Sequence, residues 1–136
     1  MRHTLYIKNE LSELARLYDF IDQHVAPCIA NKQTVAQVKL AIEELVTNII
    51  LYAYGEQKNQ TIQIEMECQG KRLKITVTDS GIPFNPLEKK DPDLSLSLED
   101  RPIGGLGIFL VKQLMNEVYY ERSSEKNIFT MIKDLS

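Results

Sequence analysis

Two polar residues, Glu44 and Asn48, lie one turn apart in a segment whose apolar residues recur at helical spacing. A carboxylate and an amide oxygen on one side of a helix can share a hard cation and its water. This is the ligand set that Mg²⁺ accepts beside phosphates. Asn is unfavourable inside a helix because its side chain competes for backbone hydrogen bonds. The alternative is a solvated Glu beside a surface Asn, and this pair alone does not decide between the two.

A second polar group follows a predicted strand, in the segment DSGIPFNP at residues 79–86. At the end of a strand, the Asp79 carboxylate could accept a hydrogen bond from an exocyclic amino group, and Gly81 would let the backbone approach a ring closely. Asp, Ser, Gly and Pro also favour a plain turn, which is the alternative interpretation.

A glycine run, Gly104-Gly105-Leu106-Gly107, leads directly into an apolar stretch of helical character. Glycines at a helix start expose backbone N–H groups, and the helix dipole adds positive potential, so the run predicts an anion site. No predicted strand directly precedes it, and it lacks both the final glycine of the dinucleotide fingerprint and the Lys-Ser/Thr of a P-loop. Both of these common nucleotide-binding folds are therefore disfavoured.

The elements that must position these groups follow from the hydrophobic pattern. One helix is expected from about Asn9 to a break near Pro27, a second over Thr34–Tyr54 with Gly55 as its stop, and a third over 105–116. Strands are expected over 3–8, 61–66, 73–78, 118–121 and 128–133, the last four as two hairpins. Strands set beside helices predict an α+β sandwich with a mostly antiparallel sheet covered on one face.

The composition is that of one ordinary domain, with 136 residues, 43% hydrophobic content and a formal net charge of −3. Basic and acidic residues are interleaved, so we expect no nucleic-acid partner. The apolar stretches are interrupted before the ~18 residues of a membrane span, so we expect no membrane segment. Cys28 and Cys68 show neither a metal-ligand nor a disulfide pattern, and the N-terminus shows no signal-peptide pattern. A reduced, cytoplasmic domain is expected.

The three polar segments together resemble the sequence boxes of the GHKL ATPase superfamily, which includes gyrase, histidine-kinase ATP domains and anti-sigma-factor serine kinases. Residues 44–48 (ELVTN) resemble its asparagine box, residues 79–86 its first glycine box, and residues 105–111 (GLGIFLV) its second. Their order and spacing agree over almost the whole chain. The resemblance implies a single domain over residues 1–136, a two-layer α/β sandwich whose mostly antiparallel mixed sheet is covered on one face by about three helices.

Within the superfamily, the DSGIPF form of the first glycine box is most similar to that of small bacterial anti-sigma-factor kinases. The resemblance implies that Glu44 is the general base and that Asn48 holds Mg²⁺ against the phosphates of ATP. Asp79 would read the adenine amino group and Gly81 would pack on the ring. The further cofactor-binding residues that it implies are Tyr52, Phe84, Gly104, Gly105, Leu106, Gly107 and Thr130.

The irregular segment between the two glycine boxes is implied to be a lid, at about residues 86–103. Its cationic candidates for the terminal phosphate are Lys89, Lys90 and Arg101, with a solvated loop charge as the alternative for each. Three departures from the family pattern affect fine contacts. Tyr52 replaces the His of many relatives, and the first glycine box lacks the second glycine found in gyrase and histidine kinases. Asn127-Ile128 replaces the glycine-threonine pair of many relatives.

The resemblance implies a serine/threonine protein kinase that phosphorylates an anti-anti-sigma partner and alternately holds a sigma factor. The alternatives are a non-catalytic ATP-binding regulatory module, an ATP domain acting on a separate phosphoacceptor protein, and plain ATP hydrolysis driving a conformational cycle. The resemblance also allows a homodimer formed through a sheet edge.

Overall fold

The computed structural model describes residues 1–83, 85 and 105–135. Phe84, Gly104 and the expected lid at 86–103, with Lys89, Lys90 and Arg101, lie outside the described residues.

The predicted helices and strands are all present. In chain order they are β1 (Arg2–Lys8), α1 (Leu14–Phe20), α2 (Lys32–Tyr52), β2 (Thr61–Gln69), β3 (Arg72–Asp79), α3 (Gly105–Leu114), β4 (Glu117–Ser123) and β5 (Lys126–Asp134). A 3-10 turn, Leu11–Glu13, precedes α1, and a π-helical segment, Ile21–Val25, with a final 3-10 turn, Ala26–Cys28, continues it. The first predicted helix thus ends at the turn that contains Pro27, because proline removes a backbone donor.

The helix α2 begins two residues before the predicted start because of its cap. Asn31 is extended, and its Oδ1 accepts hydrogen bonds from the backbone N–H groups of Gln33 at 2.8 Å and Thr34 at 3.3 Å. This satisfies two of the donors that a helix start leaves unpaired. The helix ends at Tyr52, shortly before Gly55, which adopts a φ of +58°.

The five strands form one sheet in the order β1-β2-β3-β5-β4. All four pairings between the described strands are antiparallel, which confirms the expected antiparallel character, and no parallel pair occurs among these strands. The reason lies in the connection through α3. A helical crossover returns the chain in the same direction, so β4 runs parallel to β3. Because β5 lies between those two strands, every neighbouring pair is antiparallel.

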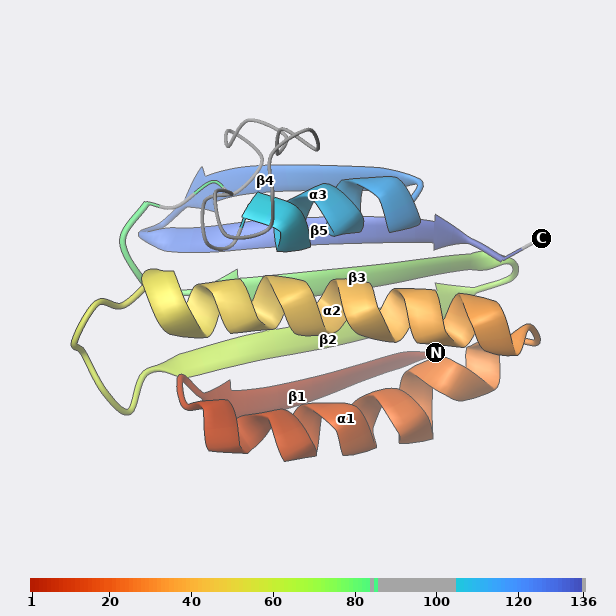
Figure 1. Ribbon diagram of the computed structural model, residues 1–136, viewed down its shortest axis with the longest axis horizontal. Coiled ribbons are helices and arrows are strands. Elements are labelled where there is room, and N and C mark those ends of the chain that lie inside the picture. Colours follow the sequence, from red (N-terminus) through yellow and green to blue (C-terminus); the bar gives the residue numbers. More distant parts are fainter. Residues whose placement is uncertain (84, 86–104, 136) are drawn as a thin grey trace.

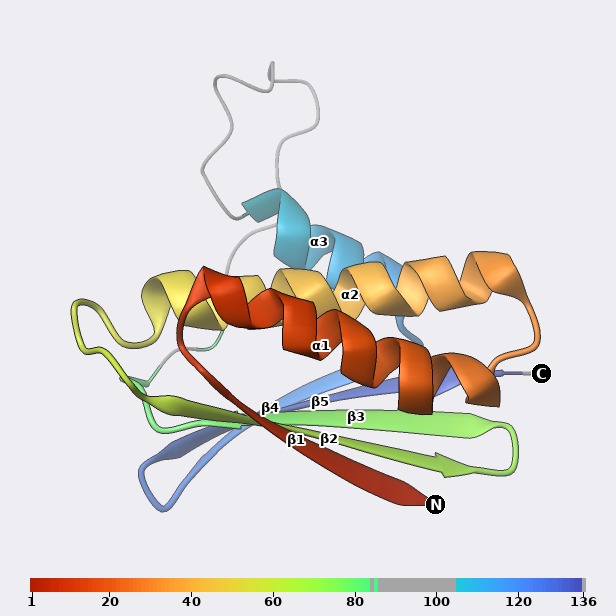
Figure 2. The ribbon, with the colours of Figure 1, turned by 90° about the horizontal axis from the view of Figure 1, so that it is seen from below.

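The helices α1, α2 and α3 lie over one face of the sheet, which gives two layers (Figures 1 and 2). Buried and exposed residues alternate along the strands, as one covered face requires. The helix-facing residues of β3 are Leu73, Ile75, Val77 and Asp79, all buried. The alternation therefore turns the Asp79 side chain toward the helices rather than toward solvent.

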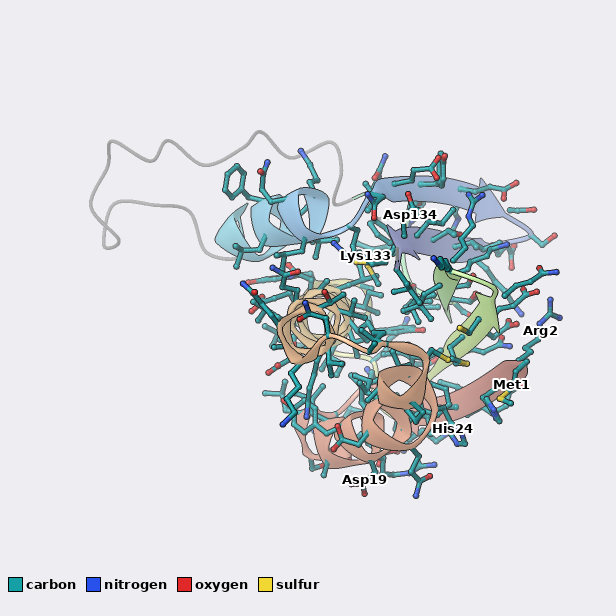
Figure 3. The ribbon with its side chains drawn as sticks, turned by 90° about the vertical axis from the view of Figure 1, so that its right-hand side faces the viewer. Met1, Arg2, Asp19, His24, Lys133 and Asp134 are labelled. Atoms are coloured by element: carbon teal, nitrogen blue, oxygen red, sulfur yellow. The ribbon has the colours of Figure 1, made fainter. Side chains whose placement is uncertain are left out.

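The β4–β5 hairpin has Ser124 and Glu125 at positive φ, 52° and 64°, as the tightest right-twisted hairpin turns require. This turn fixes the register that places Asn127 opposite Asp79. Both residues lie at one end of the sheet. The chain's first residues and the end of β5 lie at the other end, which Figure 3 views with Met1, Arg2, Lys133 and Asp134 labelled. Among the described helices, none has the length and apolarity needed to cross a bilayer.

Candidate nucleotide site

The helix α2 holds Asn48 in a buried position with one side-chain atom unpaired. Asn48 is 3% exposed, and its Nδ2 donates to the backbone carbonyl of Glu44 at 2.7 Å. Its Oδ1 is buried and has no hydrogen-bond partner among the described residues. An unsatisfied buried acceptor costs about 1–3 kcal/mol, so folding alone does not explain why it is kept. An amide oxygen is a ligand that hard cations prefer, and Asn48 therefore fits a site for Mg²⁺.

Glu44 lies one turn before Asn48 and is half-buried. Burial raises the pKa of its carboxyl above the ordinary value, and the neighbouring charge of Glu43 raises it further. Glu43 accepts a hydrogen bond from the Tyr18 hydroxyl at 2.8 Å. A carboxylate with a raised pKa binds a proton more strongly than an ordinary carboxylate does. This property suits a general base.

Asp79 is the last residue of β3 and is 3% exposed. Its Oδ1 accepts two hydrogen bonds at 2.9 Å each, from the backbone N–H of Gly81 and from Nδ2 of Asn127. Burial raises the pKa of this carboxyl, and the two hydrogen bonds and the charge of Arg122 offset that rise in part. A buried carboxylate with a donor pair on one oxygen can offer the other oxygen to a ligand amino group.

Asn127 is a site residue that sequence reasoning missed. The sequence shows it only as a departure from the family's glycine-threonine pair, whereas the structure places it directly across from Asp79. It is 3% exposed, and its Nδ2 also donates to the Ile82 carbonyl at 2.8 Å. One signal for it exists in the sequence: Asn is depleted in strands, so an Asn in an apolar strand pattern has a specific reason to be there.

The structure does not bring Thr130 together with Asp79 and Asn127, and its place at the adenine end stays a prediction. It pairs with Thr76 on β3, three residues beyond the pair of Asn127 and Asp79. Successive strand side chains alternate between faces, so an odd offset puts Thr130 on the face away from the helices. Asp79 and Asn127 lie on the face that the helices cover.

The structure gives a reason for glycine at position 81 that does not involve a ligand ring. A Cβ at this position would lie 2.3 Å from the carbonyl oxygen of Ala53, just after α2. The same carbonyl accepts a hydrogen bond from the N–H of Ile82 at 2.9 Å. The hydroxyl of Tyr54 accepts from the N–H of Ser80 at 2.8 Å. These contacts fix the chain after Asp79 against the end of the helix that carries Glu44 and Asn48.

The helix α3 begins at Gly105 and packs against α2 (Figure 1). Gly105, Leu106 and Gly107 form its first turn, where backbone N–H groups have no partner within the helix. Such a helix start attracts phosphate groups. Tyr52, the last residue of α2, is half-buried and lies one turn beyond Asn48. The end of β3, the second half of α2 and the start of α3 thus supply the described candidate residues.

Comparison with known proteins identifies the family of this chain. The model of the histidine kinase-like ATPase domain family matches residues 7–133. The anti-sigma F factor of Clostridium novyi (strain NT) is 32% identical over 95 residues, covering 70% of this chain and 66% of that protein. The serine-protein kinase RsbW of Bacillus subtilis (strain 168) is 33% identical over 95 residues, covering 66% of this chain and 59% of that protein. The match therefore spans less than two thirds of either relative.

A solved structure of the RsbU and RsbW domains of a Mycobacterium tuberculosis protein has the same fold. It superposes with a TM-score of 0.67 at 13% identity, covering 99% of this chain and 32% of that one. The family match covers nearly the whole chain. The chain belongs to the histidine kinase-like (GHKL) ATPase domain family, and it is related to the anti-sigma-factor serine kinases.

Proposed function

We propose that this chain is an ATP-dependent serine/threonine protein kinase that acts as an anti-sigma factor in the cytoplasm. It transfers the γ-phosphate of ATP to an anti-anti-sigma partner, and in its other state it sequesters a sigma factor. The observation that carries this proposal is the buried, unpaired Oδ1 of Asn48 one turn from the half-buried Glu44. The similarity to an anti-sigma F factor and to RsbW supports the choice of partners.

Nucleotide binding uses residues from each of the three described segments. Asp79 accepts a hydrogen bond from the adenine amino group, and the backbone N–H groups at Gly105 and Gly107 bind phosphate oxygens. Asn48 would hold Mg²⁺ through Oδ1, and the cation, when bound, would supply neutralisation of the phosphate charge. Phosphoryl transfer depends mainly on such positioning and charge stabilisation.

Glu44 acts on the attacking group. Its carboxylate takes the proton from the partner's serine or threonine hydroxyl as that oxygen attacks the γ-phosphorus and the bond to the β-phosphate oxygen breaks. Burial and the neighbouring charge of Glu43 raise the pKa of Glu44, which strengthens it as a base. Glu43 itself accepts a hydrogen bond from the Tyr18 hydroxyl.

The test is incubation of the chain with Mg²⁺, γ-labelled ATP and a candidate anti-anti-sigma protein. We expect acid-stable label on the partner, and we expect Glu44→Gln to reduce the rate by about 10²-fold or more while ADP still binds. The neighbouring Glu43→Gln is the matched control: it removes only the smaller cause of the raised Glu44 pKa, so the transfer should slow far less. ATP binding without transfer would identify a non-catalytic binding module, and acid-labile label would identify action on a separate histidine phosphoacceptor.

A further inference from the structure

A chain of hydrogen bonds runs across three strands at the Asp79 end of the sheet. The Tyr120 hydroxyl, on β4, donates to Oδ1 of Asn127 on β5. Nδ2 of Asn127 then donates to Oδ1 of Asp79 at 2.9 Å and to the carbonyl of Ile82 at 2.8 Å. The donor end of the amide faces two acceptors and its oxygen faces a donor, so its orientation is determined by its surroundings.

The position of Asn127 would otherwise suit an apolar residue. Phe129 and Met131, the next residues of β5 on the same face, are both apolar and buried. Asn127 is 3% exposed among them. Its buried polar atoms are therefore stabilised by the hydrogen bonds that they make within the protein. The partners of its Nδ2 group lie at the end of β3 and in the turn that follows.

The turn after Asp79 is held from both sides. From the sheet side, Arg122 on β4 donates to the Gly81 carbonyl at 2.9 Å, beside the bond from Asn127 to Ile82. From the helix side, the Ile82 N–H donates to the Ala53 carbonyl at 2.9 Å. Asp79, Asn127 and Arg122 are direct cross-strand neighbours in one row.

Oδ1 of Asp79 thereby receives two donors, one from Asn127 and one from the Gly81 N–H at 2.9 Å. This arrangement fixes the rotation of the carboxylate and directs its second oxygen elsewhere. We propose that Asn127 is a positioning residue for purine recognition, which holds Oδ1 of Asp79 so that Oδ2 is presented as an acceptor to an exocyclic amino group. The inference rests on the proposed function only in taking an adenine nucleotide as the ligand.

This role has a consequence for base choice. A purine with an amino group at C6 offers a donor to Oδ2, whereas one with a carbonyl at C6 sets an acceptor against it. A carboxyl group that is free to rotate could present an acceptor oxygen to the amino group or, when protonated, its O–H to the carbonyl group. Loss of the Asn127 donor should therefore weaken ADP binding and reduce the preference for ADP over inosine diphosphate, which carries the carbonyl.

Acid should weaken ADP binding as well, because protonation of Asp79 removes the acceptor. The Asn127 donor favours the ionised carboxylate, so its removal raises the pKa of Asp79. The other titratable or charged groups around Asp79 in the described part of the chain are Arg122 on β4, Tyr54 after α2 and, through Asn127, Tyr120. Burial raises the pKa of Tyr54, so its hydroxyl does not titrate with Asp79.

The experiment compares Asn127→Thr with Asn127→Val in the full chain. The two side chains have the same shape and strand preference, and only Thr keeps a donor. Calorimetry gives the affinity for ADP and for inosine diphosphate across an acidic to neutral pH series. We expect Asn127→Val to bind ADP about tenfold more weakly than the parent chain. The pH at which ADP binding is lost should rise, and the ratio of the affinities for ADP and inosine diphosphate should fall. Asn127→Thr should retain more of the ADP affinity, the pH profile and the base preference. Thr76→Val, on the face of the sheet away from the helices, should match the parent chain.

The outcomes separate this inference from the proposed function. If the parent chain binds ADP but Asn127→Val matches it in affinity, base preference and pH profile, the positioning role is wrong while the function stands. If the parent chain binds no ADP, the proposed function fails and this inference fails with it. A general loss of structure in Asn127→Val would show as reduced helicity by circular dichroism without nucleotide. In that event Asn127→Thr is the test of the positioning role. A pH profile of ADP binding like that of the parent chain supports the role, and a different profile overturns it.

Discussion

Asp79 and Asn127 face each other across β3 and β5, and the amide of Asn127 donates to Oδ1 of Asp79 at 2.9 Å. The second donor to the carboxylate, the N–H of Gly81, reaches the same oxygen. An Asn at position 79 could accept both of these bonds through its own Oδ1. The pair therefore allows the binding role of the Asp79 carboxylate to be removed without removing the hydrogen bonds that hold the fold.

The first prediction follows from this geometry. Asp79→Asn replaces an acceptor oxygen with a donor NH₂ group on the side of the carboxylate away from Asn127. We expect ADP affinity to fall by at least about tenfold, because a hydrogen bond to a charged group contributes ~1.5–3 kcal/mol. Calorimetry measures the affinity, and Asp134→Asn, at the far end of β5, is a control of equal charge change. Unaltered ADP affinity in Asp79→Asn would contradict base recognition by Asp79.

The second prediction concerns stability and pH. Burial raises the pKa of Asp79 in the folded chain above its ordinary value of 3.8. Ionisation is then harder in the folded state than in the unfolded state. The contribution of this group to stability is therefore complete below its ordinary pKa and is lost as pH rises through the folded pKa.

The comparison is between the parent chain and Asp79→Asn, which cannot titrate at this position. Urea unfolding from about pH 4 to about pH 8 should show the stability of Asp79→Asn rising relative to the parent as pH increases. The difference should become constant above the folded pKa. A difference that changes in the opposite direction would mean that the hydrogen bonds to Oδ1 outweigh the burial of the carboxylate.

The fold was predictable from sequence where the pattern is local. The long helix α2 and the hairpin strands follow from hydrophobic periodicity, and the polar positions Asn48 and Asp79 stand out because they interrupt it. The antiparallel pairing of β5 with β3 was not accessible, because no local pattern says that the last strand inserts between two earlier ones.

The missed site residue has a physical explanation of the same kind. Whether Asn127 or Thr130 faces the helices depends on the register of β5, and a change of one residue reverses every side chain of a strand. The register is set by the turn at Ser124 and Glu125, two residues without the glycine that usually identifies such a turn. Gly81 was similarly recognisable as special, but its contact with Ala53 is a tertiary one.

The third prediction concerns that contact. A Cβ at position 81 would lie 2.3 Å from the Ala53 carbonyl oxygen and 2.8 Å from its carbon, so Gly81→Ala must separate the end of β3 from the end of α2. Overpacking of this kind costs about 1–3 kcal/mol, and the urea midpoint should fall accordingly. The control is Ser80→Ala, an exposed neighbour whose backbone N–H still bonds to Tyr54. Equal midpoints for the two variants would mean that the turn relaxes freely and that the close approach has no structural cost.

The fourth prediction separates function from stability at Asn48. Asn48→Leu removes the buried, unpaired Oδ1, whose burial costs about 1–3 kcal/mol, and the bond from Nδ2 to the Glu44 carbonyl, worth ~0.5–1.5 kcal/mol net. The Glu44 carbonyl keeps its partner within the helix backbone. We therefore expect the variant to be as stable as the parent or more stable by up to about 1 kcal/mol in urea unfolding.

The same change should abolish the dependence of ADP affinity on Mg²⁺, measured by calorimetry with and without the cation, whereas Thr47→Val on the preceding position should preserve it. A variant that is as stable as the parent and still binds ADP more tightly with Mg²⁺ would show that the unpaired oxygen of Asn48 is not the metal ligand.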